Sequence, residues 1–127
     1  MTESAGPMAT IEAFLKAAGE KDWETALPFI SDDCEYVNIP MSRVKGPAGV
    51  RAVLEPFFAP TIENDLKVVQ TIIQGDWVFT ERLDRHRLPD KWVELPVAGM
   101  FQVRDGKITA WREYFDLATI MKEWPSA

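Results

Sequence analysis

The feature that most constrains the fold is a strict two-residue alternation in the stretch from Trp77 to His86, WVFTERLDRH. Successive side chains of a β-strand point to opposite faces, so Trp77, Phe79 and Leu83 are predicted to share one apolar face. The opposite face is predicted to carry Val78, Thr80, Arg82, Asp84 and His86. This row either faces water, as charged rows on small domains commonly do, or it lines a buried polar site.

A second alternating stretch, Ile108 to Phe115, favours the buried site. Trp111, Glu113 and Phe115 fall on one of its faces, so a carboxylate lies between two large aromatic side chains. Burial disfavours the ionised form of a carboxylate unless a cation or hydrogen-bond donors compensate. Arg82 is the predicted compensating cation.

The first half of the chain has helical periodicity. Apolar residues recur at helical spacing from Ile11 to Ala18, and Gly19 is the predicted end of this helix. Asp22 is the predicted N-cap of a second helix, which Pro28 shortens. A third helix is predicted from Val50 to Phe57, with Pro56 and Pro60 constraining its end.

Between the second and third helices, Asp32 and Asp33 indicate a turn, residues 34–39 a short strand, and residues 40–47 a loop. On this strand Tyr36 and Asn38 share a face. A phenol and an amide on one side of a strand either hold one water or substrate oxygen between them or form an outward polar pair.

The second half is predicted to be a meander of strands. A strand from residue 62 to 73 changes phase, as a bulge would cause, and is followed by Trp77–His86, Trp92–Val103 and Ile108–Phe115. Pro96 lacks an amide donor and is expected at a sheet edge or bulge. Asp105-Gly106 predicts the last hairpin, and Asp116 the cap of a closing helix.

These elements predict an α+β fold, a cone in which a curved, mostly antiparallel sheet wraps around the N-terminal helices. At 127 residues the chain is expected to form a single domain spanning residues 1–127. The mouth of such a cone suits a small apolar ligand with one polar atom.

Composition excludes several classes of function. The net charge of −6 argues against nucleic acid and anionic membranes as partners, since both require basic surfaces. No apolar run approaches the roughly 18 residues of a membrane span, and the N-terminus lacks the pattern of a signal peptide. The single cysteine, Cys34, excludes an internal disulfide, so we expect a cytoplasmic protein. One histidine and one cysteine cannot supply a zinc site, and we expect neither metal nor cofactor.

The residues from Val78 to Leu117, VFTERLDRHRLPDKWVELPVAGMFQVRDGKITAWREYFDL, resemble the limonene-1,2-epoxide hydrolases. The Glu-Arg-x-Asp segment and the Trp-Arg-acid-Tyr-Phe-Asp segment carry this resemblance, with the Tyr-x-Asn step at Tyr36 and Asn38. The family is a branch of the cone fold shared with nuclear transport factor 2 and ketosteroid isomerase. Fold alone does not give function in this superfamily, because binding proteins, isomerases and cyclases share it.

The resemblance implies one-step addition of water to an epoxide, giving a vicinal diol without a covalent enzyme intermediate. It implies that Asp84 is the general acid and Glu113 the general base, with Arg82 bridging them. Tyr36 and Asn38 would hold the attacking water. Glu113 stands where the family has an aspartate, and the extra methylene moves the carboxylate by about 1.5 Å.

Two further expectations complete the interpretation. His86 is expected at the pocket rim or, alternatively, as a polar group of the pocket mouth, where the family usually has an aliphatic residue. The apolar wall of the pocket is predicted to consist of Phe57, Leu95, Val97, Met100, Trp111 and Phe115.

Two other functions stay open. One is an isomerase or polyketide cyclase of the ketosteroid isomerase kind, which would exclude water from its base. The other is a noncatalytic module that binds a small ligand or dimerises. By analogy with cone folds of this size, a homodimer is expected.

Overall fold

The computed structural model describes residues 6–125 of the chain. Its elements, in chain order, are α1 (Pro7–Gly19), α2 (Trp23–Ala26), the 3-10 turn η2 (Leu27–Phe29), β1 (Ile30–Asn38), β2 (Ser42–Lys45), α3 (Gly46–Phe58), β3 (Glu63–Gln74), β4 (Trp77–Leu88), β5 (Lys91–Arg104), β6 (Lys107–Phe115) and α4 (Leu117–Glu123).

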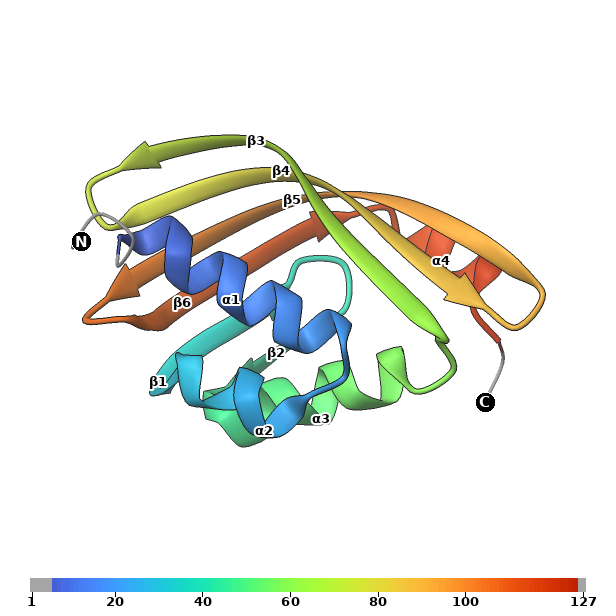
Figure 1. The fold of residues 1–127 in the computed structure, drawn as a ribbon, viewed down its shortest axis with the longest axis horizontal. Coiled ribbons are helices and arrows are strands. Elements are labelled where there is room, and N and C mark those ends of the chain that lie inside the picture. Colours follow the sequence, from blue (N-terminus) through green and yellow to red (C-terminus); the bar gives the residue numbers. More distant parts are fainter. Residues whose placement is uncertain (1–5, 126–127) are drawn as a thin grey trace.

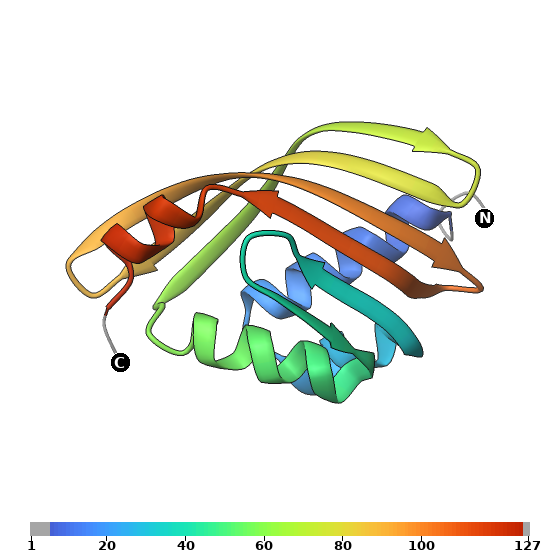
Figure 2. The ribbon, with the colours of Figure 1, turned by 180° about the vertical axis from the view of Figure 1, so that it is seen from behind.

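The six strands form one sheet in the order β2-β1-β6-β5-β4-β3. Every neighbouring pair is antiparallel except β1 and β6, which run parallel. The sheet curves over α1, α2 and α3, and α4 lies at the end where β4 and β5 join (Figure 1). The view from behind shows the same two layers, with β1 and β2 beside α3 (Figure 2). The predicted α+β fold with a curved mixed sheet is confirmed.

The helices follow from local sequence signals. α1 ends at Gly19, and the Asp22 side chain caps α2 by accepting a hydrogen bond from the backbone N–H of Thr25. After α2, Pro28 lies in the 3-10 turn, as a proline that shortens a helix should. Asp116 caps α4 in the same way, accepting from the N–H of Ala118. These predictions are confirmed.

Two sequence predictions between the second and third helices are wrong. Asp32 and Asp33 lie inside β1, which begins at Ile30, and do not mark a turn. The expected loop over residues 40–47 contains β2, which pairs with β1 from Ser42 to Lys45. Four residues on a partly exposed edge strand carry little alternation, so their pairing with β1 has no clear signal in the sequence.

Pro96 was expected at a sheet edge or bulge, and it lies at an open edge on one side of its strand only. It lies in β5, between β4 and β6, opposite Leu83 of β4. The pairing of β5 with β6 ends at Val97 and Phe115, so the β6 side of the strand is open at Pro96. A missing amide donor costs no ladder hydrogen bond at such an open side.

The core lies between the sheet and the helices, where Phe14 of α1 packs edge-to-face on Trp111 of β6, with ring centroids 5.2 Å apart. Phe101 of β5 stacks on the same indole at 5.3 Å. Within residues 6–125, no helix is both long and apolar enough to cross a membrane.

Candidate active site

Strand register assembles the site in rows that cross the concave face of the sheet. One row joins Thr80 of β4, Gly99 of β5, Glu113 of β6 and Asn38 of β1 as successive partners. The row on one side joins Val78, Phe101, Trp111 and Tyr36, and the row on the other joins Arg82, Val97 and Phe115. Asp84 and Leu95 follow one step further. All inward positions alternate with outward ones, as the sequence predicts for β4 and β6.

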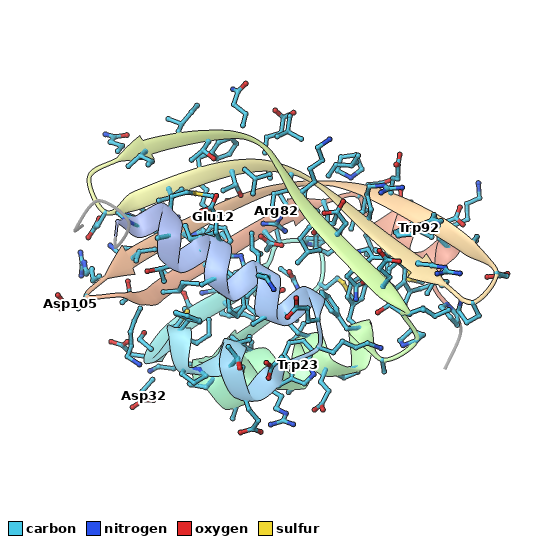
Figure 3. All side chains as sticks on the ribbon, in the orientation of Figure 1. Glu12, Trp23, Asp32, Arg82, Trp92 and Asp105 are labelled. Atoms are coloured by element: carbon cyan, nitrogen blue, oxygen red, sulfur yellow. The ribbon has the colours of Figure 1, made fainter. Side chains whose placement is uncertain are left out.

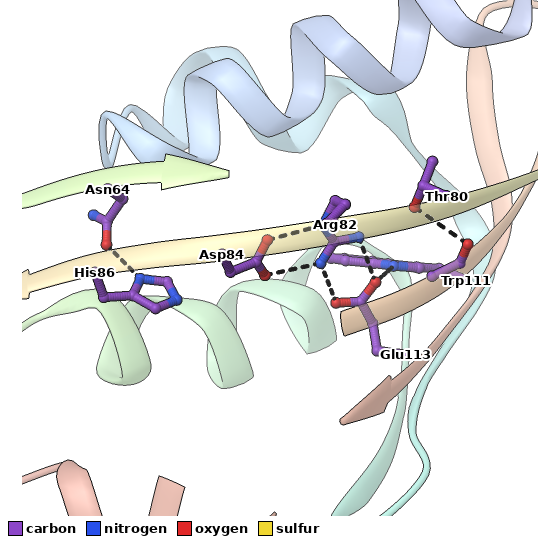
Figure 4. Close-up of polar contacts among 8 residues, drawn as sticks. Asn64, Thr80, Arg82, Asp84, His86, Trp111 and Glu113 are labelled. Atoms are coloured by element: carbon purple, nitrogen blue, oxygen red, sulfur yellow. Dashed lines mark hydrogen bonds and ion pairs between the residues drawn. The ribbon is translucent and has the colours of Figure 1, made fainter. Parts of the chain in front are cut away.

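Arg82 lies at the centre of these rows and holds two carboxylates at once (Figure 4). Its Nε and Nη2 donate to Oδ1 and Oδ2 of Asp84, both at 3.0 Å. Its Nη1 and Nη2 donate to Oε2 and Oε1 of Glu113, at 2.8 and 2.7 Å. Two edges of one guanidinium therefore bind two carboxylates in the bidentate geometry that is specific to arginine.

The three charged side chains are buried. Arg82 is 3% exposed, Glu113 6% and Asp84 7%. Arg82 points from the sheet into the interior, whereas Asp105 lies at the periphery (Figure 3). Burial disfavours the Arg82 cation, but Glu113 and Asp84 outweigh this and raise its pKa well above the ordinary value. Burial raises the pKa of Glu113, against the opposing effect of Arg82.

The Glu113 carboxylate is held by hydrogen bonds and packs closely against the backbone of β5. The Trp111 indole donates to Oε2 of Glu113 at 2.7 Å, so this carboxylate receives three hydrogen bonds. Its Oε2 also lies directly over Gly99. A Cβ at Gly99 would lie 2.6 Å from Oε2 of Glu113 and 2.7 Å from Nη1 of Arg82. A glycine is therefore required there for the backbone and the carboxylate to approach so closely.

The Tyr36 and Asn38 side chains line the same cavity as the charged cluster. Tyr36 is stacked on Trp111, with ring centroids 3.9 Å apart. Burial, and next the charge of Glu113, raise the pKa of the Tyr36 hydroxyl well above its ordinary value, so it is a neutral donor and acceptor at pH 7. Asn38 is the register partner of Glu113 across the parallel pair.

The cavity is small and mostly apolar, with a volume of about 110 Å³. Arg82, Asp84 and Glu113 form its polar part. Five of the predicted wall residues line it: Phe57, Leu95, Val97, Trp111 and Phe115. The wall on the helical side includes Phe14 of α1 and Leu54 and Phe58 of α3.

Two predicted pocket residues lie elsewhere. Met100 is not among the residues that line the cavity, because its even-numbered position on β5 points away from the face that holds Leu95, Val97 and Gly99. His86 does not line the cavity either and is only 1% exposed, so both expectations for it, at the rim and at the mouth, are wrong.

His86 is instead buried among three aromatic side chains and Asn64. The rings of Phe57, Phe58 and Trp124 contact it edge-to-face, with centroids 5.0 to 5.6 Å away. Its Nδ1 lies 2.6 Å from Oδ1 of Asn64. Burial lowers the pKa of His86 to about 4, so the ring is neutral at pH 7. Residues of α3 and Trp124, which follows α4, cover a position that strand alternation alone had directed toward the cavity.

Sequence reasoning missed Gly99 as a residue of the site. The available signal was a glycine inside a long alternating strand, which often marks a close approach of another group to the backbone. In the part of the chain that the structure describes, no group of three or more His, Cys, Asp or Glu side chains is placed to hold a metal ion.

Comparisons with known proteins identify the family of this chain. Residues 5–126 match the family described as the limonene-1,2-epoxide hydrolase catalytic domain. The chain is 33% identical over 112 residues to epoxide hydrolase EphG of Mycobacterium tuberculosis, a match covering 88% of this chain and 74% of that protein.

Solved structures show the same fold. A limonene-epoxide-hydrolase-like epoxide hydrolase from M. tuberculosis superimposes with a TM-score of 0.78 at 32% identity, covering 91% of this chain and 86% of that one. A SnoaL-like polyketide cyclase from Shewanella denitrificans gives a TM-score of 0.81 at 15% identity, with 92% and 95% covered. At that identity the second match shows the shared fold alone. Because the family match extends over nearly the whole chain and includes both strands of the charged cluster, the chain belongs to the limonene-1,2-epoxide hydrolase family.

Proposed function

We propose that this enzyme adds water directly to a small, largely apolar epoxide and releases a vicinal diol. The observation that carries the proposal is the contact of one buried guanidinium, Arg82, with both Asp84 and Glu113 beside an apolar cavity. Ring opening at neutral pH requires an acid for the departing oxygen and a base for water, and this cluster supplies one of each.

In the proposed step, Glu113 removes a proton from water while the water oxygen attacks one epoxide carbon. The bond between that carbon and the epoxide oxygen breaks, and its electron pair stays on the oxygen, which takes the proton of Asp84. Water and epoxide become one diol, Glu113 is left protonated, and Asp84 is left ionised. Return of one proton from Glu113 to Asp84 restores the starting state.

The charge balance supports these roles. Two carboxyl groups that share a single cation in a dry site favour holding one proton between them. Glu113 receives three hydrogen bonds and Asp84 two, which favours the ionised form at Glu113. Burial of Glu113 raises its pKa, and a higher pKa makes an ionised carboxylate a stronger base.

Tyr36 and Asn38 are proposed to hold the attacking water against Glu113. Both side chains line the cavity beside the carboxylate, and each offers donor and acceptor capacity. The remaining walls, including Leu95, Val97 and Phe115, are apolar, which suits an epoxide whose only polar atom is the ring oxygen.

The test is turnover of a panel of epoxides in ¹⁸O-labelled water, including single-turnover conditions. We expect label in the diol from the first cycle. Label appearing first in the protein would instead indicate a carboxylate ester and would refute direct attack by water.

The matched variants are Asp84→Asn and Glu81→Gln. Both remove one carboxylate from β4, but Glu81 is exposed on the outer face. We expect Asp84→Asn to lose turnover by about 100-fold or more while the protein stays folded, and Glu81→Gln to keep it. Unchanged turnover in Asp84→Asn would show that Asp84 is not the general acid.

A further inference from the structure

His86 is a buried polar side chain near the site that the proposed reaction does not use. It follows Asp84 by two residues on the same face of β4, so the two side chains are neighbours. Its Nδ1 is bound to Asn64, but its Nε2 is buried and, among the residues described, has no hydrogen-bond partner. Buried nitrogen atoms without a partner are rare, and each calls for an explanation.

A chain of hydrogen bonds decides which nitrogen of His86 carries the proton. The Thr61 hydroxyl donates to the carbonyl of Phe58, so its oxygen accepts from the Asn64 amide nitrogen. The same nitrogen donates to the carbonyl of Gly19. Two backbone carbonyls, which only accept, thus fix the amide of Asn64 with its oxygen toward His86.

The tautomer follows from this orientation. An amide oxygen only accepts, so Nδ1 of His86 carries the hydrogen and donates it to Asn64 at 2.6 Å. In the neutral ring, Nε2 is then a bare acceptor. Figure 4 shows this second nitrogen on the side of the ring that faces Asp84.

The surroundings of His86 leave one ionisable acid within its reach. β3 contributes Asn64, β5 contributes the register partner Val93, α3 contributes Phe57 and Phe58, and Trp124 follows the end of α4. The charged groups that act on the ring are Asp84 and, behind it, Arg82. Every guanidinium nitrogen of Arg82 already donates to Asp84 or Glu113, so the remaining candidate to supply a hydrogen to Nε2 is a protonated Asp84.

We propose that Nε2 of His86 is the acceptor toward which the proton of Asp84 is directed, in direct contact or through one bridging water, so that His86 is a positioning residue for the general acid. The inference rests on the proposed function. It explains how a carboxyl group bound on one side by a guanidinium keeps its proton: the O–H points away from Arg82 and toward the acceptor. The two side chains that hydrogen-bond to Glu113, Arg82 and Trp111, both donate to it, which favours its ionised form.

The pH dependence of kcat/KM tests the proposal through two variants of His86. Asparagine has a donor near the position of Nδ1 and nothing at the position of Nε2, whereas glutamine has an acceptor near Nε2. Loss of the acceptor destabilises protonated Asp84. In His86→Asn we therefore expect the alkaline limb of the kcat/KM profile to move to lower pH by about one unit. At a pH above this limb, kcat/KM would then be about tenfold lower than in wild type. His86→Gln should keep the limb within a few tenths of a unit of wild type.

A merely structural role predicts a different result. Both variants would then lose stability, and kcat/KM would change by one factor at every pH, with the limb unmoved. That outcome overturns the proposal. His86 itself does not contribute to the alkaline limb, because its pKa of about 4 lies far below it.

A second measurement needs no epoxide. The chain has one histidine, so its imidazole ¹⁵N resonances need no assignment. In wild type at pH 7.5 we expect a hydrogen on Nδ1 and an Nε2 resonance typical of an acceptor that receives a hydrogen bond. Asp84→Val removes the donor and should move the Nε2 resonance to that of a free acceptor, whereas the amide of Asp84→Asn can donate and should preserve it.

The two measurements separate the two proposals. An Nε2 resonance that is the same in wild type, Asp84→Asn and Asp84→Val refutes the contact, even if the enzyme opens epoxides. A resonance that responds to Asp84→Val in a protein that turns over no epoxide supports the contact and refutes the proposed function.

Discussion

Replacing Gly99 with alanine tests the geometry of the charged cluster most directly. The added Cβ would lie 2.6 Å from Oε2 of Glu113, about 0.8 Å inside the 3.4 Å at which ordinary van der Waals contact begins. It would also meet Nη1 of Arg82 at 2.7 Å and the Thr80 hydroxyl at 3.1 Å. Arg82 binds both Glu113 and Asp84, so neither Glu113 nor Arg82 can move without disturbing these contacts.

The magnitude follows from this displacement. A shift of about 1 Å in a catalytic group can lower turnover about 100-fold, so Gly99→Ala should lose kcat by about that factor. Overpacking of a buried site typically destabilises a protein by about 1–3 kcal/mol, which for this chain leaves a folded majority if its stability is ordinary. The expected variant is therefore folded, somewhat less stable, and nearly inactive.

The assay is kcat and KM on the best epoxide of the panel, together with urea unfolding. Gly75→Ala is the matched control. Its Cβ meets nothing within 4 Å, but its φ of +61° makes alanine strained there, at a cost of about 1 kcal/mol. The control should lose stability and keep kcat. A Gly99→Ala enzyme with kcat within threefold of wild type would show that the carboxylate of Glu113 does not lie over Gly99.

Three further predictions concern the donors and the buried histidine. Arg82→Lys should lower kcat by about 100-fold or more, because an ammonium cannot bind both carboxylates in bidentate fashion; kinetics with a far-UV spectrum as the folding control checks this. Trp111→Phe removes one donor to ionised Glu113, so the pKa of Glu113 should rise and the acidic limb of kcat/KM should move to higher pH. The folded-state pKa of His86 is lowered to about 4, so its contribution to stability is complete above pH 6.5 and is lost as the pH falls to about 4. This contribution is about 3 kcal/mol. The free energy of unfolding, measured with urea at pH 7 and at pH 4, should therefore fall by about 3 kcal/mol more in wild type than in His86→Asn.

Alternation in the sequence predicted the charged cluster of the site, because side chains of a strand always alternate between its two faces. Once residues 77–86 and 108–115 are strands, Arg82, Asp84 and Glu113 must share the concave face if Val78 and Trp111 are in the core. The pairing of β4 with β5 and of β5 with β6 follows from two short turns, at residues 89–90 and 105–106. Strand alternation and short turns depend on residues close together in the chain, so both can be predicted from the sequence.

The predictions that failed depend on contacts between distant segments. β2 is a strand because β1 offers it an edge, and nothing in residues 42–45 alone reveals this. His86 obeys the alternation, yet Phe57 of α3 and Trp124 beyond α4 stack at 4.3 Å and separate it from solvent. The need for glycine at position 99 arises from a carboxylate on another strand. Alternation gives the face of a residue, but not what covers that face.

The same register that builds the site also makes it sensitive to slippage. The row from Thr80 through Gly99 and Glu113 to Asn38 joins four strands through two antiparallel pairs and one parallel pair. A slip of one residue in β6 would turn Arg112 and Tyr114 inward and carry Glu113 to the outer face. Arg82, already 3% exposed and bound to Asp84, would then lose half of its charge compensation in a dry interior. Removing one partner of a buried ion pair typically destabilises a protein by about 3–5 kcal/mol, so the charged cluster that is proposed to open the epoxide also selects the register of β6.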